Sequence, residues 1–217
     1  AQALGVSIPT VSRALKDSPE ISRELCAKAK ALAKEMNYRP NPFAMSLRKN
    51  APRIIGVIVP DIVTHFFASI LNGIENMAIA NGYFVIITTS HESYEHEKRN
   101  IENLVNMRVE GIIACLSQET TDFSHISALK DINMPLILFD RVCLTDQFSS
   151  VIADGAQSAQ IATQHLLDNG SKRVAFIGGA NHLDIVKRRK HGYLEALREN
   201  RIPIEKELVV CRKIDYE

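Results

Sequence analysis

The sequence of 217 residues lacks the short motifs that mark common nucleotide-binding and catalytic sites. It contains neither the GxGxxG fingerprint of dinucleotide-binding folds nor the GxxxxGK[ST] loop that holds nucleoside phosphates. No Ser-His-Asp set and no pair of carboxylates can be recognised from their spacing. The glycine pair in "IGGANH" is a weak phosphate signal, because such a pair after a strand is usually a tight turn. We therefore expect neither an enzyme nor a cofactor.

Cysteine and histidine occur without the spacing of metal sites. The four cysteines include no CxxC pair, which predicts reduced structural thiols; they are Cys26, Cys115, Cys143 and Cys211. His91 and His96 flank the charged run "HESYEHEKR", but no HExxH pattern is present. This run is interpreted as a solvated loop and the start of a helix, and no metal is expected.

Long hydrophobic runs are also absent. No stretch approaches the roughly 20 apolar residues of a membrane helix. No signal peptide is visible, although the sequence begins without methionine. The apolar content of 46% and the charged content of 24% are those of an ordinary globular protein. We expect a cytoplasmic protein without membrane contact, long enough for more than one domain.

The net charge of +1 conceals an uneven distribution. Residues 1–53 carry ten basic and four acidic residues, a net charge of +6, whereas the remainder carries sixteen basic and twenty-one acidic residues, a net charge of −5. A small basic head on a mildly acidic body indicates that the head contacts a polyanion. A chance fluctuation is the alternative that charge alone leaves open.

From Arg53 onward, short apolar runs alternate with amphipathic stretches. This alternation predicts an α/β fold of parallel βαβ units, with a sheet covered on both faces. Strands are expected at 53–60, 83–90, 111–117, 135–141, 149–154, 173–179 and 207–211, with helices at 66–82, 94–109, 121–132, 155–170 and 184–200. We assign 53–148 to a first lobe and 149–217 to the start of a second lobe, which is incomplete because the series of βα units stops early.

Ligands on such sheets bind at the carboxyl ends of the strands. The residues expected there are Pro60-Asp61, Ser90-His91, Ser117, Asp140-Arg141, Asp154 and Gly178-Gly179. Because no nucleophile or phosphate motif accompanies them, these ends are predicted to bind a ligand and not to catalyse a reaction.

The first forty residues have the pattern of a helix-turn-helix. Gly5 is expected to stop a first helix in the left-handed conformation, and Ser7 to cap a short second helix over 8–15. Pro9 falls in its first turn, where the missing N–H costs little. A third helix over 22–38 begins at Ser22. Helix, tight turn and short helix are the arrangement that places a reading helix in a DNA major groove; a helical cap on the body is the alternative.

The outward face of the short helix carries one arginine and several hydroxyls. Hydroxyls reach phosphates, and Arg13 can bind guanine O6 and N7 through two hydrogen bonds. After it, Asn41 is a possible cap for two helical turns over 43–49, which contain Leu47. So short a helix is unstable alone. It is either a linker helix docked on the body or a wedge that enters the minor groove and kinks the DNA.

These residues carry a family resemblance. The stretch "ALGVSIPTVSRALKDSPEISRELCAKAKALAKEMNYRPNPFAMSLR" closely resembles the DNA-binding head and hinge of the lactose-repressor (LacI/GalR-type) transcription regulators. The segments "IIGVIVPDIVTHFFASILNGIE", "PLILFDR" and "RKHGYLEAL" resemble the periplasmic-binding-type core of that family. The resemblance spans nearly the whole chain, but the start of the first helix and roughly the last third of a family member are missing.

The resemblance implies a homodimeric, sequence-specific transcriptional repressor that binds a near-palindromic double-stranded DNA operator. The head would occupy 1–40 and the hinge helix 41–52. On positions that match the motif, the base readers are Ile8, Pro9 and Arg13, the backbone contacts are Ser7, Thr10, Ser12, Tyr38 and Asn41, and the minor-groove wedge is Leu47 with Arg48 beside it. Ile8 and Pro9 differ from several relatives and cannot form side-chain hydrogen bonds, so more of the specificity falls on Arg13.

The resemblance also implies a small-molecule effector between two lobes. The matching positions are Phe66, Phe67, Ser90, Asp140 and Arg189. This set suits a polyol, so a sugar or sugar acid is the first choice and a nucleobase the second. Phe66 or Phe67 could instead belong to the core, and Asp140 and Arg141 could form an internal ion pair. The effector would act by linkage, as inducer or corepressor.

Two other classes of function compete with this interpretation. A solute-binding protein of the periplasmic type would share the core, but it would lack the DNA-binding head. An α/β enzyme would need a nucleophile or phosphate motif at a strand end, and none is recognisable.

Overall fold

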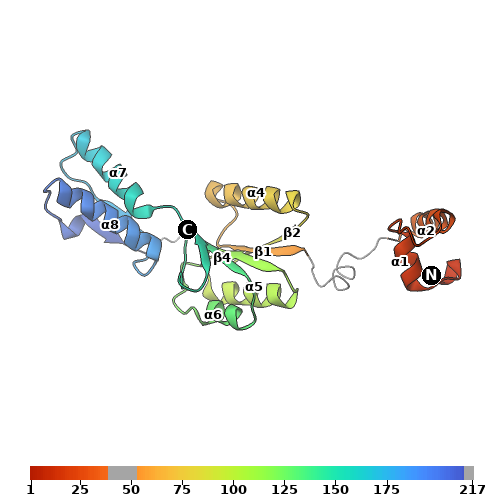
Figure 1. The fold of residues 1–217 in the computed structure, drawn as a ribbon. Helices are drawn as coiled ribbons and strands as arrows, with labels where there is room; N and C mark the ends of the chain where they lie inside the picture. Colours follow the sequence, from red (N-terminus) through yellow and green to blue (C-terminus); the bar gives the residue numbers. More distant parts are fainter. Residues whose placement is uncertain (39–52, 213–217) are drawn as a thin grey trace. The chain divides into compact units, whose positions relative to one another are not determined.

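The chain divides into two compact units, Ala1–Ala51 and Pro52–Glu217. The computed structural model describes residues 1–38 of the first unit and residues 53–212 of the second (Figure 1). The predicted hinge helix over 43–49 therefore lies outside the described residues, together with Asn41, Leu47 and Arg48.

The described part of the head contains three short helical segments. They are η1 (Gln2–Leu4), a 3₁₀ turn, followed by α1 (Ile8–Ala14) and α2 (Arg23–Glu35). Gly5 ends η1 with φ 62°, in the left-handed region that glycine adopts without strain, as the sequence predicts. The small core of the head forms around the buried side chains of Ala14, Cys26 and Ala29.

The core of the second unit begins with a five-stranded parallel sheet. Its strands lie in the order β2-β1-β3-β4-β5, and every neighbouring pair is parallel. The strands are β1 (Ile54–Val59), β2 (Phe84–Thr89), β3 (Gly111–Ala114), β4 (Leu136–Phe139) and β5 (Ser149–Val151). We call residues 53–151, which form this sheet and its helices, the first lobe.

Helices cover both faces of this sheet, as the alternating pattern predicts (Figure 1). The helix α4 (His65–Ala80) packs on one face, around Val57, Val59 and Phe67. The helices α5 (Tyr94–Asn106) and α6 (Ser124–Asp131) pack on the other face. The carboxyl ends of all five strands meet at one edge, where a ligand site is expected.

The structure differs from the expected lobe boundary at residue 149. The strand β5 is not the start of a second sheet, because it pairs with β4 in the first one, with Ile137 opposite Ser149 and Phe139 opposite Val151. Spacing along the chain does not reveal which sheet a strand joins. The second series of elements therefore begins at residue 155.

The second lobe, residues 155–212, contains two packed helices and two parallel strands. They are α7 (Gly155–Asp168), β6 (Phe176–Gly178), α8 (Asp184–Glu199) and β7 (Val209–Cys211), with the 3₁₀ turn η2 (Lys206–Leu208) before β7. The backbones of α7 and α8 approach closely at Gly192, where an added Cβ would stand 1.9 Å from the carbonyl oxygen of Ala156. None of the described helices combines the length and apolar character needed to cross a bilayer.

Candidate functional site

Ser7 begins the short helix of the head. Its side-chain oxygen accepts a hydrogen bond from the backbone N–H of Thr10 at 3.3 Å, as the predicted cap requires. The two hydroxyls of Ser7 and Thr10 also hydrogen-bond to each other at 2.8 Å. Ser22 caps α2 in the same way through the N–H of Leu25. These two caps fix where both helices begin.

The helix α1 exposes the side chains that sequence reasoning assigned to base reading. Ile8 is 73% exposed, Pro9 is exposed, and the side chain of Arg13 is 60% exposed. Ser12 is half-buried, and Tyr38 lies exposed after α2. On the opposite side, Ala14 is buried in the head core. The helix is therefore buried on one face and exposed on the other.

Arg13 is not isolated, because its Nη1 lies 3.0 Å from the carboxylate of Glu20. Two further ion pairs of the head join Lys28 to Glu24 and Lys30 to Asp17. All three pairs are largely exposed. Pairs of this kind are worth little in water, so a phosphate or a base edge can displace the carboxylate at small cost.

At the carboxyl end of β1, the two adjacent phenylalanines differ in burial. Phe67 is 7% exposed and packs edge-on against Phe139, with ring centroids 6.4 Å apart. Phe66 is 51% exposed and is available to a ligand. The start of α4 is held by Asp61, whose carboxylate accepts the N–H groups of Val63 and Thr64. The ring of Phe67 therefore belongs to the core, and that of Phe66 to the surface.

Ser90, after β2, is fully buried. Its hydroxyl forms a hydrogen bond with the hydroxyl of Ser117 at 2.9 Å, and the Ser117 hydroxyl donates to the carbonyl of Ser93 at 3.1 Å. Ser90 therefore supports the loop after β3 from within.

Asp140 and Arg141, after β4, have different partners. The guanidinium of Arg141 holds both carboxylate oxygens of Glu92, at 2.5 and 2.9 Å, and also donates to the carbonyl of Leu116. Among the described residues Arg141 forms no ion pair with Asp140. Burial raises the pKa of the Asp140 carboxyl above its ordinary value, while the charges of Arg141 and Arg189 act in the opposite direction. Asp140 and Arg189 are thus close enough to interact electrostatically.

A buried carboxylate holds the loop after β3, and sequence reasoning missed it. Glu97 is fully buried; it accepts the N–H of Ser117, the hydroxyl of Thr120 at 2.9 Å and Nε2 of His125 at 2.8 Å. The helix start expected in "HESYEHEKR" is confirmed, because α5 begins at Tyr94, but the expected solvation is wrong at Glu97. A carboxylate tolerates such burial when its oxygens are satisfied, and the donors lie far along the chain, where spacing gives no signal.

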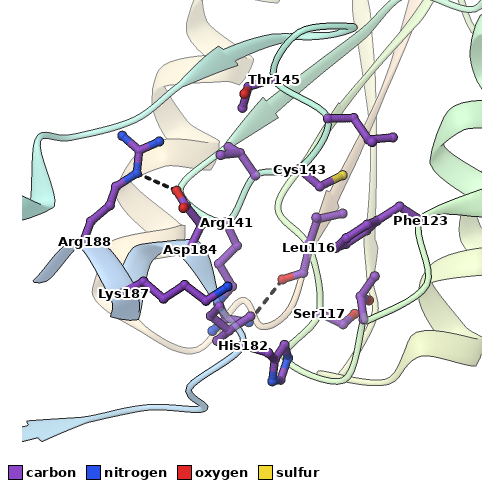
Figure 2. A pocket seen from close by; sticks show the side chains of 14 residues that line it. Leu116, Ser117, Phe123, Arg141, Cys143, Thr145, His182, Asp184, Lys187 and Arg188 are labelled. Atoms are coloured by element: carbon purple, nitrogen blue, oxygen red, sulfur yellow. Dashed lines mark hydrogen bonds and ion pairs between the residues drawn. The ribbon is translucent and has the colours of Figure 1, made fainter. Parts of the chain in front are cut away.

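A pocket of ≈ 290 Å³ lies between the loops after β3 and β4 and the first turns of α8 (Figure 2). His182, just before α8, hydrogen-bonds through Nε2 to the carbonyl of Gln118 at 2.9 Å. The first-lobe wall includes Leu116, Phe123, Val142 and Cys143, and the second-lobe wall includes Asp184, Lys187 and Arg188. None of the five residues predicted to bind an effector lines this pocket.

The four cysteines are free thiols. Burial raises the pKa of Cys115 and of Cys143 to about 12, so both stay protonated and unreactive. Within residues 1–38 and 53–212, no cluster of His, Cys, Asp and Glu could hold a metal ion.

The fold defines the class of protein. In this class a helix-turn-helix head is followed by a parallel α/β core, with ligand-sized space at the carboxyl ends of its strands. Residues 1–41 match the model for bacterial regulatory proteins of the lacI family, and residues 53–217 match that for periplasmic binding proteins and the sugar-binding domain of the LacI family. The chain belongs to the LacI family, whose members are transcription regulators and not enzymes.

Individual relatives agree with this membership. Catabolite control protein A of Priestia megaterium is 32% identical over 222 residues, covering 100% of this chain and 65% of the relative. The ribose operon repressor of Bacillus subtilis (strain 168) is 31% identical, covering 94% of this chain and 61% of that protein. The chain thus spans less than two thirds of the length of either relative.

Two solved structures are also similar. The structure of the lac repressor dimer bound to operator and the anti-inducer ONPF has a TM-score of 0.78 and 25% identity, covering 98% of this chain and 63% of that one. A periplasmic binding protein/LacI transcriptional regulator from Alkaliphilus metalliredigens QYMF, complexed with D-xylulofuranose, has a TM-score of 0.66 and 25% identity, covering 76% and 58%.

Proposed function

We propose that this protein is a sequence-specific DNA-binding transcriptional repressor whose operator affinity is controlled by a small-molecule effector. The observation that carries the proposal is the helix α1. It is capped by Ser7, anchored by Ala14 and exposed on the face that presents Ile8, Pro9 and Arg13. A helix held in this way can enter a major groove with its backbone unchanged, provided that the Arg13 side chain leaves Glu20.

The proposed contacts on DNA divide into reading and positioning. Arg13 reads a guanine through two hydrogen bonds after leaving Glu20, while Ile8 and Pro9 make apolar or shape-dependent contacts. Contacts to the DNA backbone come from Ser7, Thr10, Ser12, Tyr38 and Asn41. Leu47 enters the minor groove, with Arg48 beside it. A homodimer would place two such heads on a near-palindromic operator, in the cytoplasm.

The effector proposed for the strand ends is a sugar or a sugar derivative. Phe66 offers an exposed ring for the apolar face of a sugar, and Asp140 and Arg189 offer hydrogen-bonding groups for its hydroxyls. Phe67 and Ser90 are both buried, so they would support the residues that contact the sugar. The sugar in the structure of the similar Alkaliphilus metalliredigens regulator supports this class of ligand.

A solute-binding protein of the periplasmic type remains the second candidate, and the head argues against it. The deciding experiment is selection of a randomised palindromic DNA library by the full-length protein, with and without a panel of sugars. We expect one selected sequence, with affinity that falls steeply as salt rises, because phosphate contacts release counterions. No selected sequence together with no salt-dependent DNA binding would refute the regulator proposal.

A further inference from the structure

The pocket between the loops after β3 and β4 and the start of α8 is lined by other residues than the proposed sugar site. Its lining contains none of Phe66, Asp140 and Arg189. Its volume of ≈ 290 Å³ is near the lower end of the range for small-molecule sites, about 300–1,000 Å³. The pocket therefore has room for one small molecule.

The first-lobe wall of this pocket combines apolar side chains with Ser117 and Thr120, whose hydroxyls are already hydrogen-bonded within the lobe. Leu116 is 3% exposed and packs in the same cluster as Phe123 and Val142, which also line the pocket. Figure 2 shows Leu116 and Phe123 on the first-lobe side. Cys143 adds a thiol that stays neutral, since burial raises its pKa to about 12. A polyol pressed against this wall would leave hydroxyls without hydrogen-bond partners, which is costly. The wall instead suits a hydrocarbon or aromatic body.

The opposite wall carries one positive charge in excess. Arg141 is already committed to Glu92 by two hydrogen bonds, and Arg188 pairs with Asp184 at 2.5 Å. The carboxylates of Glu92 and Asp184 are thus each paired with an arginine. Lys187 also lines the pocket and extends from α8 toward the first-lobe side chains (Figure 2). No ion pair is found for Lys187 within the described part of the chain.

We propose that this pocket binds a small organic acid, with its single carboxylate on Lys187 and its apolar body against Leu116, Phe123 and Val142. The exposed Thr145 also lines the pocket. This inference goes beyond the proposed sugar-responsive repressor, because it assigns a second ligand of another chemical class to different residues. An acid bound here would touch both lobes and bias their arrangement.

The test is isothermal titration of the full-length protein with acetate, isovalerate and phenylacetate. Two further probes each lack one half of the ligand: phenylacetamide has no carboxylate, and inorganic phosphate has no apolar body. We expect affinity to rise from acetate to phenylacetate. Phenylacetamide and phosphate should bind at least about tenfold more weakly than phenylacetate, since a charge-assisted hydrogen bond or the apolar contact is missing.

Two variants locate the binding. Lys187→Gln removes the ammonium that is proposed to bind the carboxylate, and it should weaken phenylacetate binding by about tenfold or more. Lys190→Gln makes the same change three residues along α8, outside the pocket lining, and should leave the affinity within about twofold.

Three results would overturn the proposal. They are no binding of any carboxylate, equal binding of phenylacetate by Lys187→Gln and the parent protein, and binding of acetate or phosphate as tight as that of phenylacetate. Operator affinity without any ligand, measured on the same variants, should not change. A failure of acid binding with intact DNA binding would thus refute this inference alone.

Discussion

At the scale of single residues, the partner of a charged side chain decides its role more than its position in the sequence. Arg141 was a possible ion-pair partner of Asp140 by adjacency, yet it binds Glu92. Asp140 lies half-buried without an ion pair to Arg141, and its φ of 58° is in the left-handed region. Adjacent residues after a strand point in different directions, so spacing alone does not assign their contacts.

Arg13→Ala should weaken binding to the cognate operator by about 1–3 kcal/mol and relax the preference at one base pair. The reason is that no other residue of the exposed face of α1 offers two hydrogen bonds to one base. Binding should be measured on the selected operator and on its single-base variants. Arg23→Ala, which removes an exposed arginine from α2, is the matched control for charge.

A uniform loss on every sequence would contradict the reading role of Arg13. The residue would then be a phosphate contact, because phosphate contacts weaken all sequences alike and reduce the slope with salt.

Asp140→Asn should increase the free energy of unfolding at pH 7. Burial raises the pKa of Asp140 in the folded state, so ionisation destabilises the native protein at every pH above its ordinary value of 3.8. The stability lost by the parent protein grows as pH rises through the folded-state pKa. Urea unfolding should therefore show that the advantage of Asp140→Asn shrinks as the pH is lowered from 7. An advantage that does not change with pH would contradict this cause.

The matched control is Asp131→Asn, because Asp131 is exposed at the end of α6. It should have little effect on the free energy of unfolding at any pH.

In addition, Asp140→Asn should bind the sugar effector more weakly, since an amide is a poorer acceptor than a carboxylate.

At the scale of elements, the sequence predicts what depends on local pattern. The caps at Ser7 and Ser22, the left-handed Gly5 and the alternation of strands and helices are all confirmed, because each rests on residues within one or two turns. The sheet to which β5 belongs and the burial of Glu97 were not predictable. Both depend on partners distant in sequence, which periodicity does not encode.

The candidate site was likewise only partly predictable from the sequence. Its location at the carboxyl ends of the strands follows from the α/β pattern. Which of Phe66 and Phe67 faces outward depends on the rotation of α4, and a shift of one residue along a helix changes the face. The pocket lined by Lys187 could not be foreseen, because its two walls come from residues far apart in the chain.

Gly192→Ala should destabilise the protein by about 1–3 kcal/mol. An added methyl group would collide with the backbone of α7 at Ala156, which cannot move aside as a side chain can. Thermal unfolding measures the change. Gly73→Ala is the matched control, because nothing lies within 4 Å of its added Cβ in α4. This control should stabilise by about 0.5–1 kcal/mol. Equal effects of both variants would show that helix propensity, and not the close approach, decides the outcome.

At the scale of the whole molecule, the effector and the operator should be linked through the arrangement of the lobes. If a sugar changes operator affinity by a given factor, typically about 5- to 150-fold, the operator must change sugar affinity by the same factor. Titrating each ligand in the absence and presence of the other measures both. Operator affinity that is unchanged at saturating sugar would refute effector control while leaving DNA binding intact.

The order of strands in the first sheet has a consequence for synthesis on the ribosome. The strand β1, almost entirely buried, is translated first but lies inside the sheet, where Ile54 pairs with Phe84 and Ile55 with Gly111. Until β2 and β3 have emerged, the nascent chain therefore carries an apolar strand with both edges unpaired. The head needs only local contacts and can fold meanwhile. Newly made chains should thus be most prone to aggregation, and most dependent on chaperones, while the segment after β1 is being translated.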